Sequence, residues 1–225
     1  MKNGFPNEDE YLIRCQNVGF INERGRRISG IDLEILKGEK VCILSSVLGL
    51  ESDALHLLAG FIKPCHGIIS FKEKNFKRDI CFLPQDMVYP KNVMNVVIGK
   101  ERCSVFDFSK KKAITSRALE ALDTVGCSEL AKMHFSELSL GQKKRVLFAK
   151  ALFSFGDTVF LEYPTQGLDA VGAKNVNLNL KKLSKTVIFS SRDIREALEF
   201  ADKILYLSDN MHFFGTPEEL AILLC

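Results

Sequence analysis

A serine, a glycine and a glutamine meet at the start of a predicted helix, and such a segment can bind an anion. Ser139 suits a helix N-cap, Gly141 lets the backbone approach a ligand closely, and Gln142 follows directly. Free backbone N–H groups at a helix N-terminus attract phosphate or carboxylate. The same residues also fit a capped core helix with a solvated first turn, so on their own they leave both interpretations open.

Three basic residues follow in the first turn of this helix. Lys143, Lys144 and Arg145 oppose the helix dipole, and a nearby phosphate or acidic surface would offset that cost. The run from 146 to 153 is mostly apolar, which predicts a deeply buried helix.

The segment Leu-Ser-Leu-Gly-Gln at 138–142 resembles the Leu-Ser-Gly-Gly-Gln signature of ATP-binding-cassette (ABC) ATPases, with Leu140 in place of the first glycine. The resemblance extends from about Leu12 to Leu220. It implies an α/β fold of the P-loop NTPase type, with a parallel core sheet, an antiparallel edge subdomain and a helical subdomain. We expect a single domain over residues 1–225, with the helical subdomain at about 86–144.

A second match lies where a buried strand at 40–45 leads through a loop into a helix at 52–60, the setting of a phosphate-binding loop. In the family this loop reads Gly-x-x-Gly-x-Gly-Lys-Ser-Thr. The corresponding positions here are Ser45, Ser46, Val47, Leu48, Gly49, Leu50, Glu51, Ser52 and Asp53.

The departures in this loop change its chemistry. Leu48 and Leu50 place bulk where the backbone must approach phosphate, and Glu51 replaces the lysine that neutralises it. A carboxylate about 4 Å from a phosphate charge costs about 4 kcal/mol at an effective dielectric near 20. Ser52 keeps the position of a magnesium ligand. We expect a vestigial loop that holds neither nucleotide nor metal. In the alternative interpretation, the loop simply joins a strand to a helix.

The remaining catalytic positions of the family are also altered. Glu162 occupies the position of the aspartate that, in the family, holds magnesium through water. Tyr163 occupies the position of the glutamate that activates the attacking water. Tyrosine, with a pKa near 10, is a poor base at neutral pH. Arg192 stands for the histidine that senses the γ-phosphate. We predict an ion pair between Arg192 and Glu51 or Glu162 in the space that phosphate or metal would take.

The elements that the family offers to a partner are better retained. By resemblance, Ser139, Gly141, Gln142 and Asp169 would contact nucleotide on an opposite subunit, since two cassettes of this family pair head to tail. Gln85 matches the glutamine of the Q-loop.

The aromatic residue that stacks on adenine in the family is missing. The aligned position is Asn22, and Phe20 or Tyr11 would be its substitute.

Composition excludes several other classes of protein. A net charge of +3 is too small to argue for nucleic acid, and the seven cysteines show no zinc spacing, so we expect reduced thiols. The first ten residues lack the apolar core of a signal peptide, and no apolar run approaches about 18 residues, which predicts no membrane span.

Together these features predict an ATP-binding subunit of an ABC transporter that is catalytically degenerate. ATP and Mg²⁺ would bind only in a composite site with a second, intact ABC subunit, and transmembrane permease subunits would hold the chain at the cytoplasmic face of the membrane. Two alternatives stay open. One is a nucleotide-free structural or regulatory module that pairs with itself or with a membrane protein. The other is a soluble ABC protein outside transport.

Overall fold

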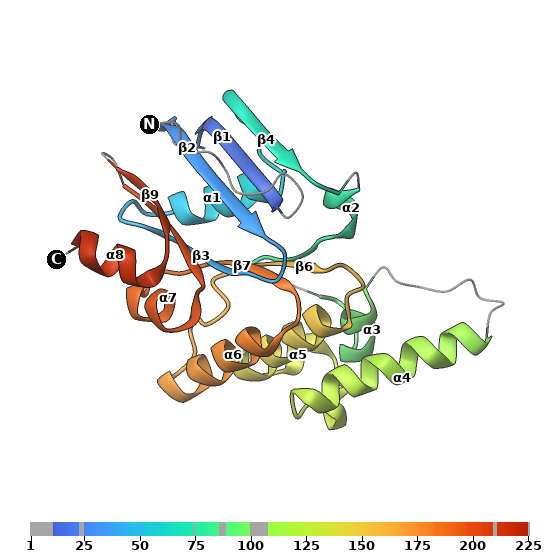
Figure 1. Ribbon diagram of the computed structural model, residues 1–225. Helices are drawn as coiled ribbons and strands as arrows, with labels where there is room; N and C mark the ends of the chain where they lie inside the picture. The colour runs from blue at the N-terminus through green and yellow to red at the C-terminus, as the bar shows by residue number, and fades with distance from the viewer. Residues whose placement is uncertain are drawn as a thin grey trace.

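The computed structural model describes residues 11–22, 25–73, 75–85, 89–99, 108–208 and 211–224. Its helices and strands form two sheets and a group of helices (Figure 1). The strands are β1 (Tyr11–Ile21), β2 (Arg27–Leu36), β3 (Lys40–Ser45), β4 (His66–Phe71), β5 (Cys81–Leu83), β6 (Thr158–Glu162), β7 (Thr186–Ser190), β8 (Lys203–Leu207) and β9 (His212–Gly215). The α-helices are α1 (Leu50–Leu58), α2 (Phe76–Asp79), α3 (Val93–Ile98), α4 (Phe108–Thr124), α5 (Leu140–Phe153), α6 (Ala170–Lys182), α7 (Ile194–Phe200) and α8 (Pro217–Leu224).

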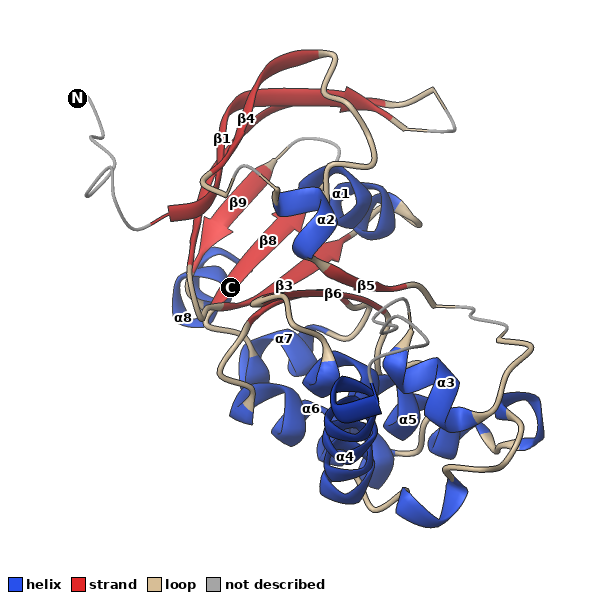
Figure 2. Ribbon diagram, turned by 90° about the vertical axis from the view of Figure 1, so that its right-hand side faces the viewer, coloured by secondary structure: helices blue, strands red, loops and turns tan. Residues whose placement is uncertain are grey.

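The larger sheet has the strand order β5-β6-β7-β3-β8-β9 and is parallel apart from β9, which runs antiparallel to β8. The smaller sheet, β2-β1-β4, is antiparallel. Helix α1 lies between the two sheets, and α5, α6 and α7 cover the opposite face of the larger sheet (Figure 2). The predicted fold class, with a parallel core and an antiparallel edge unit, is confirmed.

Alternating residues of the central strands feed two separate cores. On β3, Val41 and Ile43 pack with α1 and the smaller sheet, whereas Cys42 and Leu44 pack with the helices of the other face. Strands buried on both faces read as continuous apolar runs, which is why 40–45 carries no polar alternation. This doubly covered sheet fixes the carboxyl ends of β3, β6 and β7, where the candidate site lies.

Helices α3 and α4 pack against each other and against α5. The helical subdomain expected at about 86–144 would end inside α5, because this helix continues without a break to Phe153. Asp86, the expected start, lies outside the described residues.

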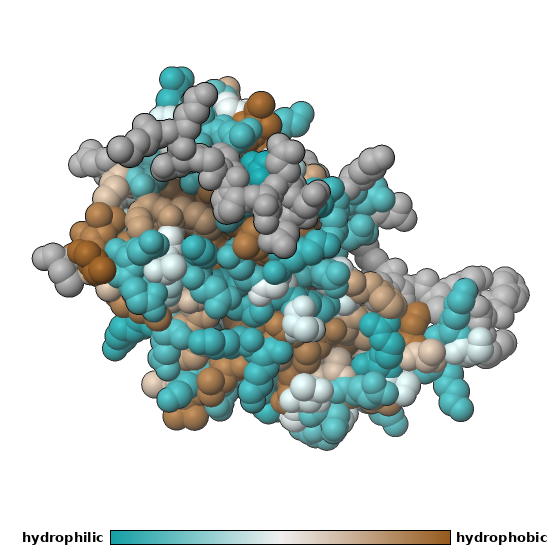
Figure 3. All heavy atoms as spheres, viewed as in Figure 1, coloured by the Kyte–Doolittle hydropathy of each residue, from teal (hydrophilic) through white to brown (hydrophobic). Residues whose placement is uncertain are grey.

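The face of the molecule in Figure 3 is mainly hydrophilic, with an apolar group at the end of α8. Ile222, Leu223 and Leu224 form this group and are exposed. No helix in the described part of the chain is long and apolar enough to cross a lipid bilayer.

Candidate functional site

The phosphate-type loop has the predicted order of strand, loop and helix. Strand β3 ends at Ser45, and α1 starts at Leu50 with Gly49 as its N-cap. Gly49 has a left-handed φ of 87°, which glycine adopts without strain. Glu51 and Asp53 place two carboxylates in the first turn, where the helix dipole favours negative charge.

Several backbone N–H groups of this loop bond within the protein itself. In a phosphate-binding loop such groups surround the anion. Here they have internal acceptors at 2.9–3.2 Å. The pairs are Ser46 N to Leu207 O, Val47 N to Ser45 Oγ, Leu50 N to Val47 O and Ser52 N to Gly49 O. These four N–H groups are therefore already bonded to acceptors of the loop or of β8.

The two leucines of the loop point to different environments. Leu48 is 58% exposed at the loop surface, whereas Leu50 is fully buried in the core between α1 and the sheets. The expectation that Leu50 crowds the phosphate position is therefore wrong. Helix α1 begins at Leu50, and that position of its first turn faces the core.

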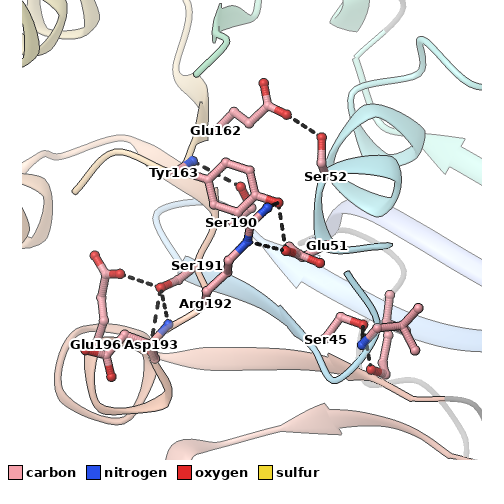
Figure 4. A network of polar contacts seen from close by, with 12 residues as sticks. Ser45, Glu51, Ser52, Glu162, Tyr163, Ser190, Ser191, Arg192, Asp193 and Glu196 are labelled. Atoms are coloured by element: carbon pink, nitrogen blue, oxygen red, sulfur yellow. Dashed lines mark hydrogen bonds and ion pairs between the residues drawn. The ribbon is translucent and has the colours of Figure 1, made fainter. Parts of the chain in front are cut away.

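A buried carboxylate, Glu51, lies at the centre of the site (Figure 4). Its side chain is only 2% exposed, and its Oε1 accepts hydrogen bonds from Tyr163 Oη at 2.7 Å and from Arg192 Nε at 3.1 Å. Arg192 also reaches Tyr163 Oη at 3.4 Å and lies over the tyrosine ring, 4.7 Å from its centroid. The predicted ion pair is confirmed, with Glu51 as the partner of Arg192.

The environment of Tyr163 and Arg192 shifts the pKa values of both side chains. Burial, and then the hydrogen bond to Glu51, raises the pKa of Tyr163. The bonds to Tyr163 and Glu51 raise the pKa of Arg192. At neutral pH Tyr163 is therefore a neutral donor and Arg192 a cation, and neither can accept a proton from an attacking water.

A second group of contacts involves Glu162. Ser52 Oγ donates a short hydrogen bond to Glu162 Oε1, and Glu162 Oε2 accepts one from Gln85 N at 3.0 Å. Three predicted site residues from α1, β6 and the segment after β5 therefore meet here. Glu162 does not pair with Arg192, because Arg192 is committed to Glu51.

The signature segment forms a capping box at the start of α5. Ser139 Oγ accepts from Gln142 N at 3.3 Å, and Gln142 Oε1 accepts from Ser139 N at 2.9 Å. The capping prediction is confirmed. Leu140 is 48% exposed and leans over Gly167, where an added Cβ would lie 2.6 Å from Leu140 Cδ2. Gly141 has open space around it, since no atom would lie within 4 Å of an added Cβ.

Asp169 performs a structural task that the sequence reasoning missed. It is the N-cap of α6, and its Oδ1 accepts from Gly172 N at 2.8 Å. An Asp directly before a helix is the sequence signal for this cap. Since its other carboxylate oxygen is not part of the cap, capping leaves Asp169 able to contact a second chain.

Tyr163 joins elements that the sequence did not connect. Its φ is 45°, rare for a bulky residue, and its backbone is held on both sides. Tyr163 N donates to Ser190 Oγ at 3.1 Å, and Tyr163 O accepts from Lys144 Nζ at 3.0 Å. Lys144 on the signature helix therefore contacts the same residue that bonds to Glu51.

The position aligned with the adenine-stacking ring, and its two predicted substitutes, all have contacts within the protein or are buried. Asn22 is buried, and its Oδ1 accepts from Arg26 N at 2.8 Å. Phe20 is fully buried, so it cannot replace the missing ring. The Tyr11 ring lies under the Arg14 guanidinium, 4.1 Å from its centroid.

The chain is similar to proteins of one large family. The sequence profile described as "ABC transporter" matches residues 28–166. A sulfate/thiosulfate import ATP-binding protein of Rhizobium meliloti is 29% identical over 84% of this chain and 59% of its own length. A manganese transport system ATP-binding protein of Bacillus subtilis is 27% identical over 93% of this chain and 88% of its own length. The chain thus spans about three fifths of the length of the sulfate/thiosulfate relatives and most of the manganese one.

Solved structures show the same fold. A protein described as cbiO1 from Clostridium perfringens, part of the ABC transporter complex cbiONQ, superimposes with a TM-score of 0.80 at 24% identity, over 95% of this chain and 92% of the other. A dimeric ATP-binding cassette bound to ADP and Pi gives a TM-score of 0.74 at 24% identity, over 91% of this chain and 98% of the other. The profile covers more than half of the sequence, and we conclude that the chain belongs to the ABC transporter family.

Proposed function

We propose that the chain is a catalytically silent ATP-binding-cassette subunit of an ABC transporter and that it donates its signature segment to the ATP site of a second, intact cassette. The observation that carries this proposal is the Glu51–Tyr163–Arg192 network in the chain's own phosphate site. The side chains of this network occupy the place where the family binds phosphate.

The energetics of that network oppose nucleotide binding. A phosphate charge about 4 Å from the Glu51 carboxylate would meet repulsion of about 4 kcal/mol at an effective dielectric near 20. Drawing Arg192 away to the phosphate would leave Glu51 buried without its cation. Both routes to a bound phosphate are therefore unfavourable.

The chemical step also lacks its participants on this chain. Tyr163 stands at the position of the general base, and its raised pKa keeps it a proton donor. Ser52 and Glu162, at the positions of the metal ligands, bond to each other. ATP cleavage would therefore have to use the base, lysine and metal ligands of a partner cassette.

The geometry of the signature segment is compatible with its contacting nucleotide on a partner cassette. Gly141 has open space for a ligand's approach, and Leu140 lies against Gly167. The relatives are named for different substrates, sulfate/thiosulfate and manganese. We therefore extend the transport function to this chain but assign it no substrate. Permease subunits would hold the chain at the cytoplasmic face of the membrane.

One observation favours the second candidate, a nucleotide-free module. Leu140 remains 48% exposed at the signature, and the Ser139 hydroxyl is engaged in the helix cap. If these features prevent contact with nucleotide, the chain contributes pairing surface only.

Copurification of the tagged chain from its own cells separates the two candidates. We expect an ABC subunit with an intact phosphate-loop lysine and catalytic glutamate, together with a permease, at defined stoichiometry. Recovery of the chain only with itself, or only with a membrane protein, would contradict the donor function.

A further inference from the structure

A cavity of about 550 Å³ opens between α6 and α7, beside the loop that follows β6. Its wall combines small and apolar side chains with polar ones, and it includes Tyr163 and Arg192 of the network around Glu51. Lining residues include Leu168, Ala173, Asn177, Glu196 and Phe200. The short side chain of Ala173 leaves room on the α6 side.

Glu196 lines this cavity and is a buried carboxylate, only 7% exposed. Its Oε2 accepts from the hydroxyls of Ser191 and Thr165, the latter at 3.1 Å. Its Oε1 is buried and has no hydrogen-bond partner among the described residues. In Figure 4 the second carboxylate oxygen points away from Ser191.

A second unpartnered oxygen lies in the wall on the facing helix. Asn177 on α6 is 3% exposed, and its Oδ1 has no hydrogen-bond partner among the described residues. A buried polar group without a partner costs about 1–3 kcal/mol, and a buried carboxylate is ordinarily paired with a cation. No ion pair of Glu196 occurs in the part of the chain that the structure describes.

The other charges around the cavity are arranged differently. Arg192 is paired with Glu51, and Arg195 with Asp193 at 3.0 Å, so neither serves Glu196. Lys174 and Glu199 lie on exposed parts of the lining. Among the described residues, Glu196 Oε1 and Asn177 Oδ1 therefore remain acceptors to which no donor is bonded.

We propose that this cavity binds a small organic cation with a guanidinium or primary ammonium group, whose N–H donors bond to Glu196 Oε1 and Asn177 Oδ1. Both oxygens are buried and unpartnered, so binding requires these side chains to rotate toward the cavity. A guanidinium fits best, because its planar array of donors can serve two acceptors and its faces stack on aromatic rings such as Phe200. The site goes beyond the proposed transport function and does not depend on it.

Arginine and citrulline form a matched pair of probes. They have nearly the same shape, but citrulline carries a neutral urea in place of the guanidinium. The carboxylate of either compound would face Lys174 at the rim. Calorimetry with the purified full chain needs neither ATP nor a partner, so its outcome is independent of the donor function.

We expect arginine to bind at least ten-fold more tightly than citrulline. Glu196→Gln and Asn177→Leu should each weaken arginine binding at least ten-fold, whereas Glu218→Gln, an equal change of charge on exposed α8, should leave it unchanged. Equal binding of the two probes, no binding of arginine, or equal effects of Glu196→Gln and Glu218→Gln would overturn the proposal. If Glu196→Gln fails to fold, the probe comparison and Asn177→Leu decide.

Discussion

Replacing Arg192 by alanine should destabilise the fold through Glu51. The substitution leaves a carboxylate that is 2% exposed without its cation, with Tyr163 Oη as the remaining donor to its Oε1. Breaking a fully buried pair costs about 3–5 kcal/mol. The Arg192 side chain is 49% exposed, so water can partly replace it. We therefore expect a loss of about 1.5–3 kcal/mol, typical of a hydrogen bond to a charged group.

Urea denaturation of a double-mutant cycle tests this reasoning. In the Glu51→Gln background no buried charge remains, so Arg192→Ala should cost less than about 1 kcal/mol. The difference between the two backgrounds measures the coupling of the pair. Equal losses in both would show that Arg192 stabilises the protein through its contact with the Tyr163 ring, and our account of the site would be refuted.

Four further expectations concern the phosphate-type loop, Tyr163 and two cysteines. The isolated chain should show no low-micromolar binding of Mg-ATP by calorimetry, and Glu51→Lys should not produce ATP hydrolysis, because Tyr163 still lacks a basic group. The pKa of Tyr163 is raised in the folded protein. The neutral hydroxyl therefore contributes fully to stability below about pH 10, the ordinary pKa of tyrosine, and this contribution is lost as the pH rises further. Tyr163→Phe should flatten that loss in unfolding curves taken between about pH 9 and 11; an unchanged slope would count against the assignment. Exposed Cys65 should react with a thiol reagent in the native protein, whereas Cys42, fully buried with its thiol pKa raised by burial, should react only on unfolding.

The sheet was predictable because its central strands are short apolar runs between turns. The strand predicted at 40–45 matches β3 to the residue. The helix predicted over 52–60 begins two residues earlier, since Gly49 can cap it in a left-handed conformation. Because the helix starts at Leu50, this side chain faces the core. An alignment by residue type could not predict that orientation.

The site was predictable in its charges and not in its connections. The charge of Arg192 and the carboxylates of Glu51 and Glu162, placed in one family frame, were enough to predict that Arg192 pairs with one of the two. The sequence did not distinguish Glu51 from Glu162 as the partner, because that choice depends on side-chain geometry. The bonds of Tyr163 to Glu51 and to Lys144 were not predicted. Alignment with the family gives the role that each position has in relatives, but it does not show which contacts form when the residue at that position is different.

The donor function is tested most directly by comparing Gly141→Asp with Glu51→Ala in the assembled complex. Gly141 has room for a side chain, and an acidic residue suits the first turn of α5, so the variant should fold, as circular dichroism can verify. Its carboxylate would face the γ-phosphate on the partner, with repulsion of about 4 kcal/mol at 4 Å and a dielectric near 20. We expect ATPase activity to fall about 100-fold or more with Gly141→Asp and to remain nearly unchanged with Glu51→Ala. Small, equal effects of the two substitutions would contradict the claim that this chain donates its signature to another chain's ATP site.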